Sequence, residues 1–385
     1  MMTSLLNLPS EGAFVFRVWR PDLSGPSVCT LRGNTVVDVT CAAVPTVRDL
    51  LELDDPSAWL AGAEGVTVGT LAQIEANSTE HPDQDRPRFL APPDLQAIKA
   101  CGVTFAFSML ERVIEEKAQG DPGKAEQIRL RCKSILGDSL RSVVPGSEKA
   151  AELKDALIEE DMWSQYLEVG IGPDAEVFTK SQPMSAVGWG ASVGLHPISN
   201  WNNPEPEVVL AVDGSGRIKG AALGNDVNLR DVEGRSALLL GKAKDNNAST
   251  SIGPALRLFD QTFSMDDVRR LQLDLKVTGP DGFKLVGHST MTEISRDPED
   301  LVAQTRGRHH QYPDGFFLFL GTLFAPTEDR NAPGEGFTHK LGDIVEISCA
   351  ELGTLRNTVR LSTECPEWTF GTSAFMRNLA KRNLI

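Results

Sequence analysis

A short turn between two apolar runs constrains the fold of this chain more than any other feature of its sequence. Val208–Val212 and Ile218–Ala222 flank five residues, Asp213 to Arg217, with the sequence Asp-Gly-Ser-Gly-Arg. Glycine adopts the positive φ angles of tight turns without steric cost, and β-branched residues favour extended backbone. We therefore predict an antiparallel hairpin, with its turn centred near Ser215, as the organising unit of a β-rich fold.

Further apolar runs of strand length lie on both sides of a helical stretch. We predict strands at Phe14–Trp19, Thr35–Val39, Gly65–Leu71, Leu271–Thr278, Phe283–Gly287, Phe316–Leu320 and Ile344–Ser348. The segment Leu95–Thr104 is largely apolar and is broken near its end by Gly102. Between residues 110 and 165, glutamate, lysine, arginine, alanine and leucine dominate, which is typical of helices with a solvated face. A second helix is predicted from Pro298 to His309, with Asp297 as its N-cap.

The order of these segments predicts an α+β chain of two domains. A polar, proline-containing stretch from His81 to Pro93 marks the boundary. We expect a small N-terminal α/β domain at residues 1–94 and a β-rich catalytic domain at 95–385, with a helical insertion at 110–165.

Composition narrows the class of partner. The 385 residues include 38 Lys+Arg and 53 Asp+Glu, a net charge of −15, which disfavours nucleic acid and anionic membranes as partners. Six cysteines lie far apart with no Cys-x-x-Cys spacing, so we expect free thiols. No apolar run reaches the roughly 18 residues that span a bilayer, and no export signal opens the chain. These features predict a cytoplasmic protein that acts on small molecules.

Three carboxylates gather at the open end of the predicted hairpin. Glu205 and Glu207 are two residues apart, so on a strand they share one face. A turn near Ser215 places Asp226 opposite Pro204 and Glu205. Such close like charges repel unless they are neutralised, and oxygen ligands suit Mg²⁺, with Mn²⁺ or Ca²⁺ as substitutes. The alternative is a solvated acidic edge whose groups are paired separately.

These residues belong to a series of motifs that resembles the fumarylacetoacetate hydrolase family between about Gly102 and Asn357. The motifs are Glu205-Pro-Glu207, Asn225-Asp-Val-Asn-Leu-Arg-Asp231, Lys244 with Ile252-Gly-Pro254, Gly321-Thr322, Leu341-Gly-Asp343 and Leu352-Gly-Thr-Leu-Arg-Asn357. The resemblance implies a mixed β-sandwich roll and a divalent metal held by Glu205, Glu207 and Asp226. It also implies that Lys244 lies near the metal-bound substrate and that Lys180 is the lysine of the family's Phe-x-Lys segment.

One departure from the family's hydrolases concerns the general base. Those enzymes carry a His–Glu pair that activates water, and the position of the histidine is Ser108 here. A serine has no basic nitrogen near neutral pH. Hydrolysis would then need another histidine brought in by folding, of which the pair His309-His310 is one candidate.

The same region resembles the family's dehydratase branch, which removes water from 2-keto-3-deoxy sugar acids. The resemblance rests on Gly102-Val-Thr-Phe105 followed by Ser108 and Arg112, and on Glu176 before Lys180. It implies dehydration of 2-keto-3-deoxy-D-pentonate to 2,5-dioxopentanoate in oxidative pentose degradation, by a homo-oligomer (dimer or tetramer). The implied catalytic residues are Lys244, Glu176 and Lys180, and the implied substrate-binding residues are Ser108, Arg112, Thr322 and Asn225.

Two other functions stay open at this point. An acylpyruvate (2,4-diketo acid) hydrolase would share the metal site but need a base for water. A non-catalytic, metal-binding family member would need neither Lys244 nor Glu176.

Overall fold

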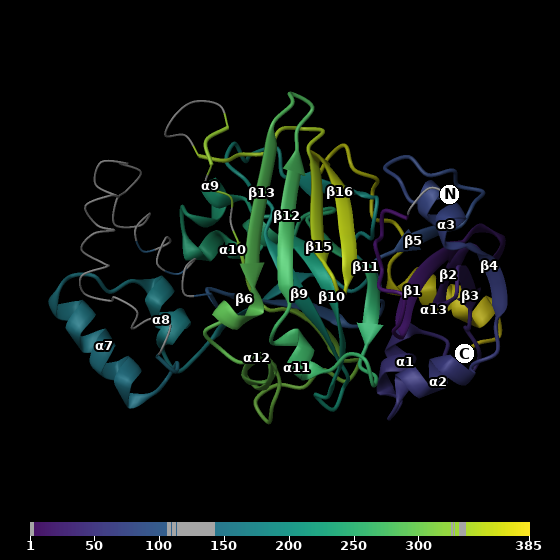
Figure 1. Ribbon diagram of the computed structural model, residues 1–385, viewed down its shortest axis with the longest axis horizontal. Helices are drawn as coiled ribbons and strands as arrows, with labels where there is room; N and C mark the ends of the chain where they lie inside the picture. The colour runs from purple at the N-terminus through teal and green to yellow at the C-terminus, as the bar shows by residue number, and fades with distance from the viewer. Residues whose placement is uncertain are drawn as a thin grey trace.

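The computed structural model describes residues 4–105, 109, 113, 143–324, 326, 328–330 and 336–385. Strands form most of its framework (Figure 1). Their bounds are β1 (Phe14–Arg20), β2 (Gly25–Arg32), β3 (Thr35–Asp38), β4 (Val66–Thr70), β5 (Arg88–Leu90), β6 (Ala97–Gly102), β7 (Glu176–Ser181), β8 (Ser192–Leu195), β9 (Pro206–Val212), β10 (Ile218–Asp226), β11 (Thr250–Leu258), β12 (Gln272–Thr278), β13 (Lys284–Thr290), β14 (Phe316–Phe319), β15 (Ile344–Cys349) and β16 (Gly353–Leu361).

The strands form two mixed sheets. The larger has the order β4-β3-β2-β1-β11-β10-β9-β14-β6-β7, with β5 paired to β1, and the smaller has the order β13-β12-β15-β16-β8. Most neighbours are antiparallel, whereas β14 with β6 and β16 with β8 are parallel. One apolar core lies between the sheets, and a second lies on the other face of the larger sheet beneath the N-terminal helices. This architecture confirms the α+β, β-rich prediction.

Short helices cover the edges of these sheets. They are α1 (Val47–Glu52), α2 (Pro56–Gly62), α3 (Leu71–Asn77), α7 (Glu148–Glu159), α8 (Gln165–Ile171), α9 (Arg230–Glu233), α10 (Leu240–Lys244), α11 (Met265–Val268), α12 (Pro298–Thr305) and α13 (Thr372–Lys381), with 3-10 turns η1 (Pro21–Leu23), η2 (Ala237–Leu239) and η3 (Met291–Glu293). The Asp297 side chain accepts a hydrogen bond from the backbone of Glu299, which confirms the predicted N-cap of α12. That helix ends at Thr305, four residues before the predicted end.

Each predicted strand is present, but β2, β5, β6, β7, β8, β11 and β16 were not predicted individually. Strand β11 contains Gly253-Pro254, a pair that in sequence reads as a break. The structure accommodates it because the pairing of β10 with β11 shifts register between Ala221 and Leu223, where a bulge removes the need for a regular ladder.

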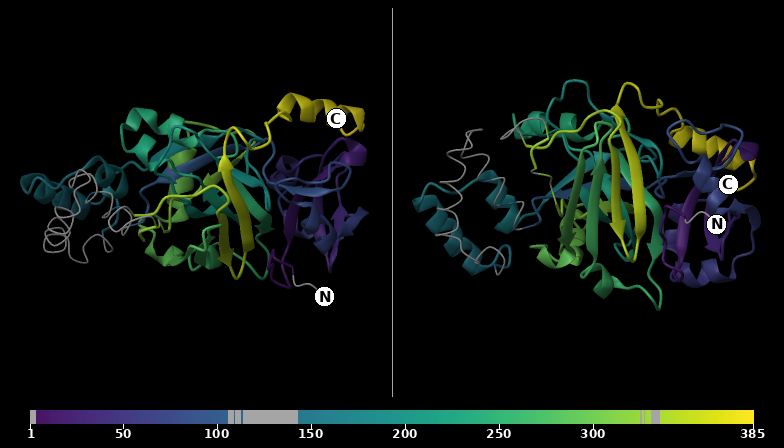
Figure 2. Two further views of the ribbon diagram at one scale, coloured as in Figure 1. Left: turned by 90° about the horizontal axis from the view of Figure 1, so that it is seen from above. Right: turned by 45° about the horizontal axis from the view of Figure 1, so that its top comes forward.

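Helices α7 and α8 lie at the opposite end of the molecule from the chain termini (Figure 2). Helices α7 and α8 share their own apolar cluster, which includes Leu157 and Leu167. At the other end, Asn378 of α13 donates to the carbonyl groups of Leu23 and Ser24 and ties the C-terminus to the N-terminal strands. The larger sheet continues across the predicted boundary at residue 94, because β1 pairs with β11. The division into domains stays a prediction.

Two further predictions concern properties of the whole chain. The five cysteines among the described residues are free thiols, and Cys132 lies outside those residues. Within the described ranges, no helix is both long enough and apolar enough to cross a membrane.

Candidate metal centre

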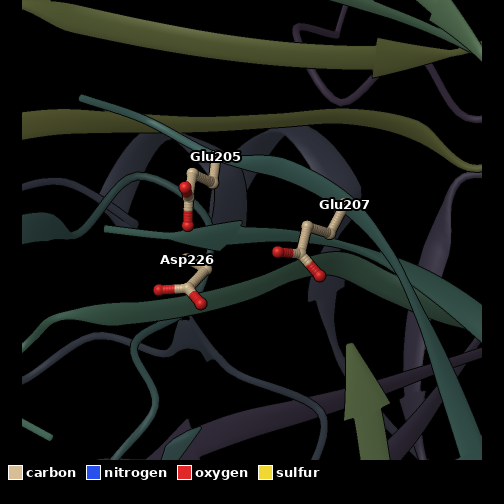
Figure 3. A group of neighbouring side chains, drawn as sticks. All are labelled: Glu205, Glu207 and Asp226. Atoms are coloured by element: carbon tan, nitrogen blue, oxygen red, sulfur yellow. The ribbon is translucent and has the colours of Figure 1, made fainter. Parts of the chain in front are cut away.

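Strands β9 and β10, in the middle of the larger sheet, bring three carboxylates together at the open end of their hairpin. The observed register pairs Gly224 with Glu207, as the predicted hairpin requires, and the backbone N–H of Asp226 donates to the carbonyl of Glu205. One oxygen from each of Glu205, Glu207 and Asp226 lies within 4.8 Å of the others (Figure 3). All three residues are buried, with at most 3% of their surface exposed. A solvated acidic edge is therefore excluded.

Each carboxylate has one oxygen held by a donor from another part of the chain. The three contacts are Asn228 Nδ2 to Glu205 Oε1 (2.9 Å), Lys180 Nζ to Asp226 Oδ1 (3.1 Å) and the backbone N–H of Gly321 to Glu207 Oε2 (2.7 Å). Such contacts orient ligand oxygens and raise the affinity of a site for its ion.

Two buried lysines contact the cluster. Lys244, the last residue of α10, places Nζ 2.7 Å from Glu205 Oε2 and 3.1 Å from Asp226 Oδ2. Lys180 Nζ also donates to the backbone carbonyl groups of Lys244 (2.8 Å) and Ser249 (3.1 Å). In addition to these two hydrogen bonds, Lys180 Nζ forms the ion pair with Asp226.

Burial and crowding shift the pKa values of these groups. Burial, followed by the charges of Asp226 and Glu205, raises the pKa of Glu207 well above its usual range. Burial also raises the pKa of Asp226, against the opposing effect of Lys180 and Lys244. For Lys244, burial alone would lower the pKa, but the charges of Asp226 and Glu205 outweigh it and raise the pKa. Burial lowers the pKa of Lys180.

The residues fit a hard divalent cation. Among the described residues, two ammonium groups pair with Glu205 and Asp226, and neither pairs with Glu207, in a site with almost no access to water. Its donor atoms are carboxylate oxygens, which bind Mg²⁺, Mn²⁺ and Ca²⁺ in preference to softer metals. Glu205, Glu207 and Asp226 therefore form a site that could hold a divalent metal.

Glu176 and Thr322 lie near the Glu207 side of the cluster. Glu176 opens β7 opposite Gly102, and a Cβ atom at Gly102 would lie 1.8 Å from Glu176 Oε2, so the glycine makes room for this carboxylate. Burial, then the charges of Glu207 and Glu176, raise the pKa of the intervening Cys101 thiol. Thr322 Oγ1 lies 3.5 Å from Glu207 Oε1.

Asn225, expected to bind substrate, points away from the cluster. Successive side chains on a strand alternate between faces, so Asn225 faces the smaller sheet while Asp226 faces the other way. Its Oδ1 accepts a hydrogen bond from the backbone N–H of Glu205 instead. The expected residues Ser108 and Arg112 lie outside the described residues.

The histidines that might have replaced the missing base do not approach the carboxylates. Among the described residues, His339 contacts Asp343 and His288 contacts Asp274. The ring of His310 packs edge-on against Tyr312 beyond the end of α12. No hydrogen bond or ion pair in the described part of the chain brings a histidine to the three carboxylates.

Two contributors to the cluster were missed in the sequence. Asn228 lies within the quoted motif but received no role, because only its position after β10 shows that Nδ2 reaches Glu205. The backbone N–H of Gly321 carries no side-chain signal. A positive φ of 100° at this residue, with Thr104 Oγ1 2.0 Å from the position of a Cβ atom, explains why glycine is needed there.

Comparison with known proteins agrees with this geometry. Residues 173–360 match the family model described as fumarylacetoacetate hydrolase, C-terminal. This segment of the chain, about half of its length, resembles the C-terminal part of fumarylacetoacetate hydrolases. It contains the three carboxylates, both lysines and Glu176, whereas the N-terminal strands lie outside it.

Two curated relatives and one solved structure are similar to this chain. A 2-dehydro-3-deoxy-D-arabinonate dehydratase of Saccharolobus solfataricus is 29% identical over 48% of this chain and 58% of its own length. A probable 2-keto-3-deoxyxylonate dehydratase of Haloferax volcanii is 31% identical over 52% of this chain and 65% of its own length. The matched segments thus span less than two thirds of either relative.

The structural match covers more of the chain. A solved 2-keto-3-deoxy-D-arabinonate dehydratase, complexed with magnesium and 2,5-dioxopentanoate, covers 90% of this chain and 99% of its own, at 20% identity and a TM-score of 0.61. At this identity the match establishes the shared fold.

Proposed function

We propose that this protein is a Mg²⁺-dependent dehydratase of a 2-keto-3-deoxy-pentonate, with 2,5-dioxopentanoate as the product. The observation that carries the proposal is the buried cluster of three carboxylates, with Lys244 in direct contact with two of them. The similar proteins named as dehydratases of this substrate class support it.

In this proposal Glu205, Glu207 and Asp226 hold the cation. When bound, the cation would polarise the C2 ketone of the substrate and acidify the C3 protons. Asn228, Lys180 and the backbone of Gly321 keep the three carboxylates in place during turnover, because each already holds one ligand oxygen.

The reaction then needs one group to accept a C3 proton and another to protonate the departing C4 hydroxyl. Lys244 and Glu176 take these two parts. Lys244 contacts Glu205 and Asp226, and Glu176 opens β7 beside Gly102. Loss of water leaves a C3–C4 double bond. Removal of a proton from C5 and return of one to C3 moves that bond, and the resulting enol gives the C5 aldehyde. General acid–base groups contribute about 10²–10⁴-fold each.

The assay that tests the proposal uses 2-keto-3-deoxy-D-xylonate as substrate. A coupled NAD-linked semialdehyde dehydrogenase reports 2,5-dioxopentanoate, and EDTA followed by added Mg²⁺ tests the metal. We expect turnover that EDTA removes and Mg²⁺ restores, and a loss of about 10²-fold or more in Glu176→Gln.

Two other results would contradict the proposal. Pyruvate release from acylpyruvates, without dehydration of the sugar acid, would assign the protein to the hydrolases of the family. No turnover of either substrate class by a protein that binds Mg²⁺ would favour the non-catalytic function.

A further inference from the structure

The Lys244 ammonium occupies carboxylate oxygens that face the candidate metal site. Asn228 and Lys180 hold the other oxygens of Glu205 and Asp226, at 2.9 and 3.1 Å. The remaining oxygens, Glu205 Oε2 and Asp226 Oδ2, both contact Lys244 Nζ, at 2.7 and 3.1 Å. An ammonium group and a divalent cation therefore compete for the same two atoms.

A third carboxylate lies next to this ammonium. Glu233, the last residue of α9, places Oε2 3.8 Å from Lys244 Nζ. This oxygen is buried and accepts no hydrogen bond among the described residues. The Glu233 side chain is 22% exposed, whereas those of Glu205 and Asp226 are 3% and 2% exposed. Glu233 thus lies on the solvent side of Lys244, away from the deepest part of the cluster.

Other neighbours leave few places for the ammonium to go. The ring of Phe178 borders it, with its centroid 6.0 Å from Nζ. The second ammonium, that of Lys180, pairs with Asp226 on the inner side of the cluster and repels the Lys244 ammonium. Among the described residues, Glu233 is the remaining carboxylate within ion-pair distance of Lys244.

We propose that Glu233 is a positioning residue for Lys244: it holds the ammonium beside the site when a divalent cation takes the oxygens of Glu205 and Asp226. This inference rests on the proposed metal site. The Lys244 ammonium competes with the cation for these oxygens. Glu233 lowers the free energy needed to displace the ammonium, because the ammonium exchanges one carboxylate partner for another. Without Glu233 the ammonium would leave its ion pairs for a site poor in water, which is unfavourable for a charge.

The proposal predicts opposite effects of two substitutions on metal affinity. Lys244→Met removes the competitor and should tighten Mn²⁺ binding. Glu233→Gln removes the alternative partner and should weaken Mn²⁺ binding by up to about fivefold in the otherwise unchanged protein, the upper end for a partly exposed ion pair. In the Lys244→Met background Glu233→Gln should have almost no effect, since no ammonium remains to be held.

A double-mutant cycle measured by titration calorimetry with Mn²⁺ alone tests this coupling, with no substrate present. Asp231→Asn is the matched control, because Asp231 lies on the same helix but accepts hydrogen bonds from Ser199 and Asn200. Circular dichroism and thermal unfolding check each variant, and Lys244→Gln replaces Lys244→Met if the latter fails to fold.

Each outcome of the cycle decides between defined alternatives. Equal weakening by Glu233→Gln with and without Lys244, or by Asp231→Asn, would show general electrostatics and overturn the role of Glu233. A protein that binds no Mn²⁺ would overturn both this inference and the metal site. Mn²⁺ binding with the expected coupling, but without dehydratase turnover, would keep the inference and overturn only the proposed reaction.

Discussion

The three buried carboxylates of the candidate metal centre and the buried carboxylate Asp343, with the ion-pair cluster around it, have opposite electrostatics. In the candidate metal centre, burial and neighbouring charges raise the pKa values of Glu207 and Asp226. In a second cluster, Asp343 is equally buried, yet contacts with Arg330 and His339 outweigh burial and lower its pKa.

The number of donors per carboxylate explains the difference. The single carboxylate of Asp343 contacts both terminal nitrogens of Arg330, Nδ1 of His339 at 3.0 Å and the backbone N–H of Lys340 at 3.0 Å. In the metal centre, Lys180 and Lys244 pair with Asp226 and Glu205, and Glu207 accepts hydrogen bonds from the backbone N–H of Gly321 and from Thr322. A single acid held by a guanidinium group is a structural element, whereas three carboxylates within 4.8 Å of one another suit a cation.

The largest effect expected from this comparison is that of Glu207→Gln. The substitution removes one ligand charge, and turnover and Mg²⁺ affinity should each fall by more than about 100-fold, since even outer partners of metal ligands contribute 10- to 100-fold. The metal-free variant should unfold at the same temperature as the parent or higher, because an underpaired buried charge is gone. Calorimetry with Mg²⁺ and thermal unfolding measure both. Near-normal turnover at saturating Mg²⁺ would refute the metal assignment.

Arg330→Met should have the opposite profile. Breaking a buried ion pair by removing one partner costs about 3–5 kcal/mol of unfolding free energy, measured by urea denaturation. The Mg²⁺ affinity of the folded variant should be unchanged. Lys340→Met is the control: its ion pair with Asp281 is partly exposed, at 43% and 34%, so the loss should stay below about 1 kcal/mol. If Arg330→Met leaves stability intact but weakens Mg²⁺ binding, the two clusters are not separate in function.

Added Mg²⁺ should raise the free energy of unfolding only in variants whose three carboxylates are intact. A ligand at 100 times its dissociation constant stabilises the native state by about 2.7 kcal/mol. We expect this increment in the parent protein and in Arg330→Met, and no increment in Glu207→Gln. The measurement is urea denaturation with Mg²⁺ or EDTA. An increment that survives in Glu207→Gln would place the cation elsewhere.

The smallest effect concerns pH and the second cluster. Burial lowers the pKa of His339 below the ordinary histidine value, despite Asp343. Below about pH 6.5 the unfolded chain therefore binds a proton that the native state does not. The free energy of unfolding then decreases as the pH is lowered, until the lowered native pKa is reached. One group contributes at most about 1.4 kcal/mol per pH unit. Urea denaturation between pH 5 and 7 gives the free energy of unfolding at each pH. This free energy should change less with pH in His339→Gln than in the parent protein, and an equal change would exclude His339 as the source.

Much of the metal centre could be predicted because its determinants are local. The turn at Asp213–Arg217 sets the register of β9 and β10, and the period of two along a strand then places Glu205, Glu207 and Asp226 on one face. The same alternation would have shown that Asn225 points to the other face.

Tertiary structure decided what surrounds those carboxylates. Lys180, Lys244 and Gly321 come from segments far apart in sequence. No pattern within any one segment specifies that Lys180 pairs with Asp226 and donates to two carbonyl groups. The strand β11 also depends on a neighbour, since its Gly-Pro pair is tolerated through a bulge. Local periodicity therefore determined which acids share a face. The packing of distant segments decided how much of the carboxylates' charge is neutralised, because burial and ion pairing depend on every segment that packs around the carboxylates.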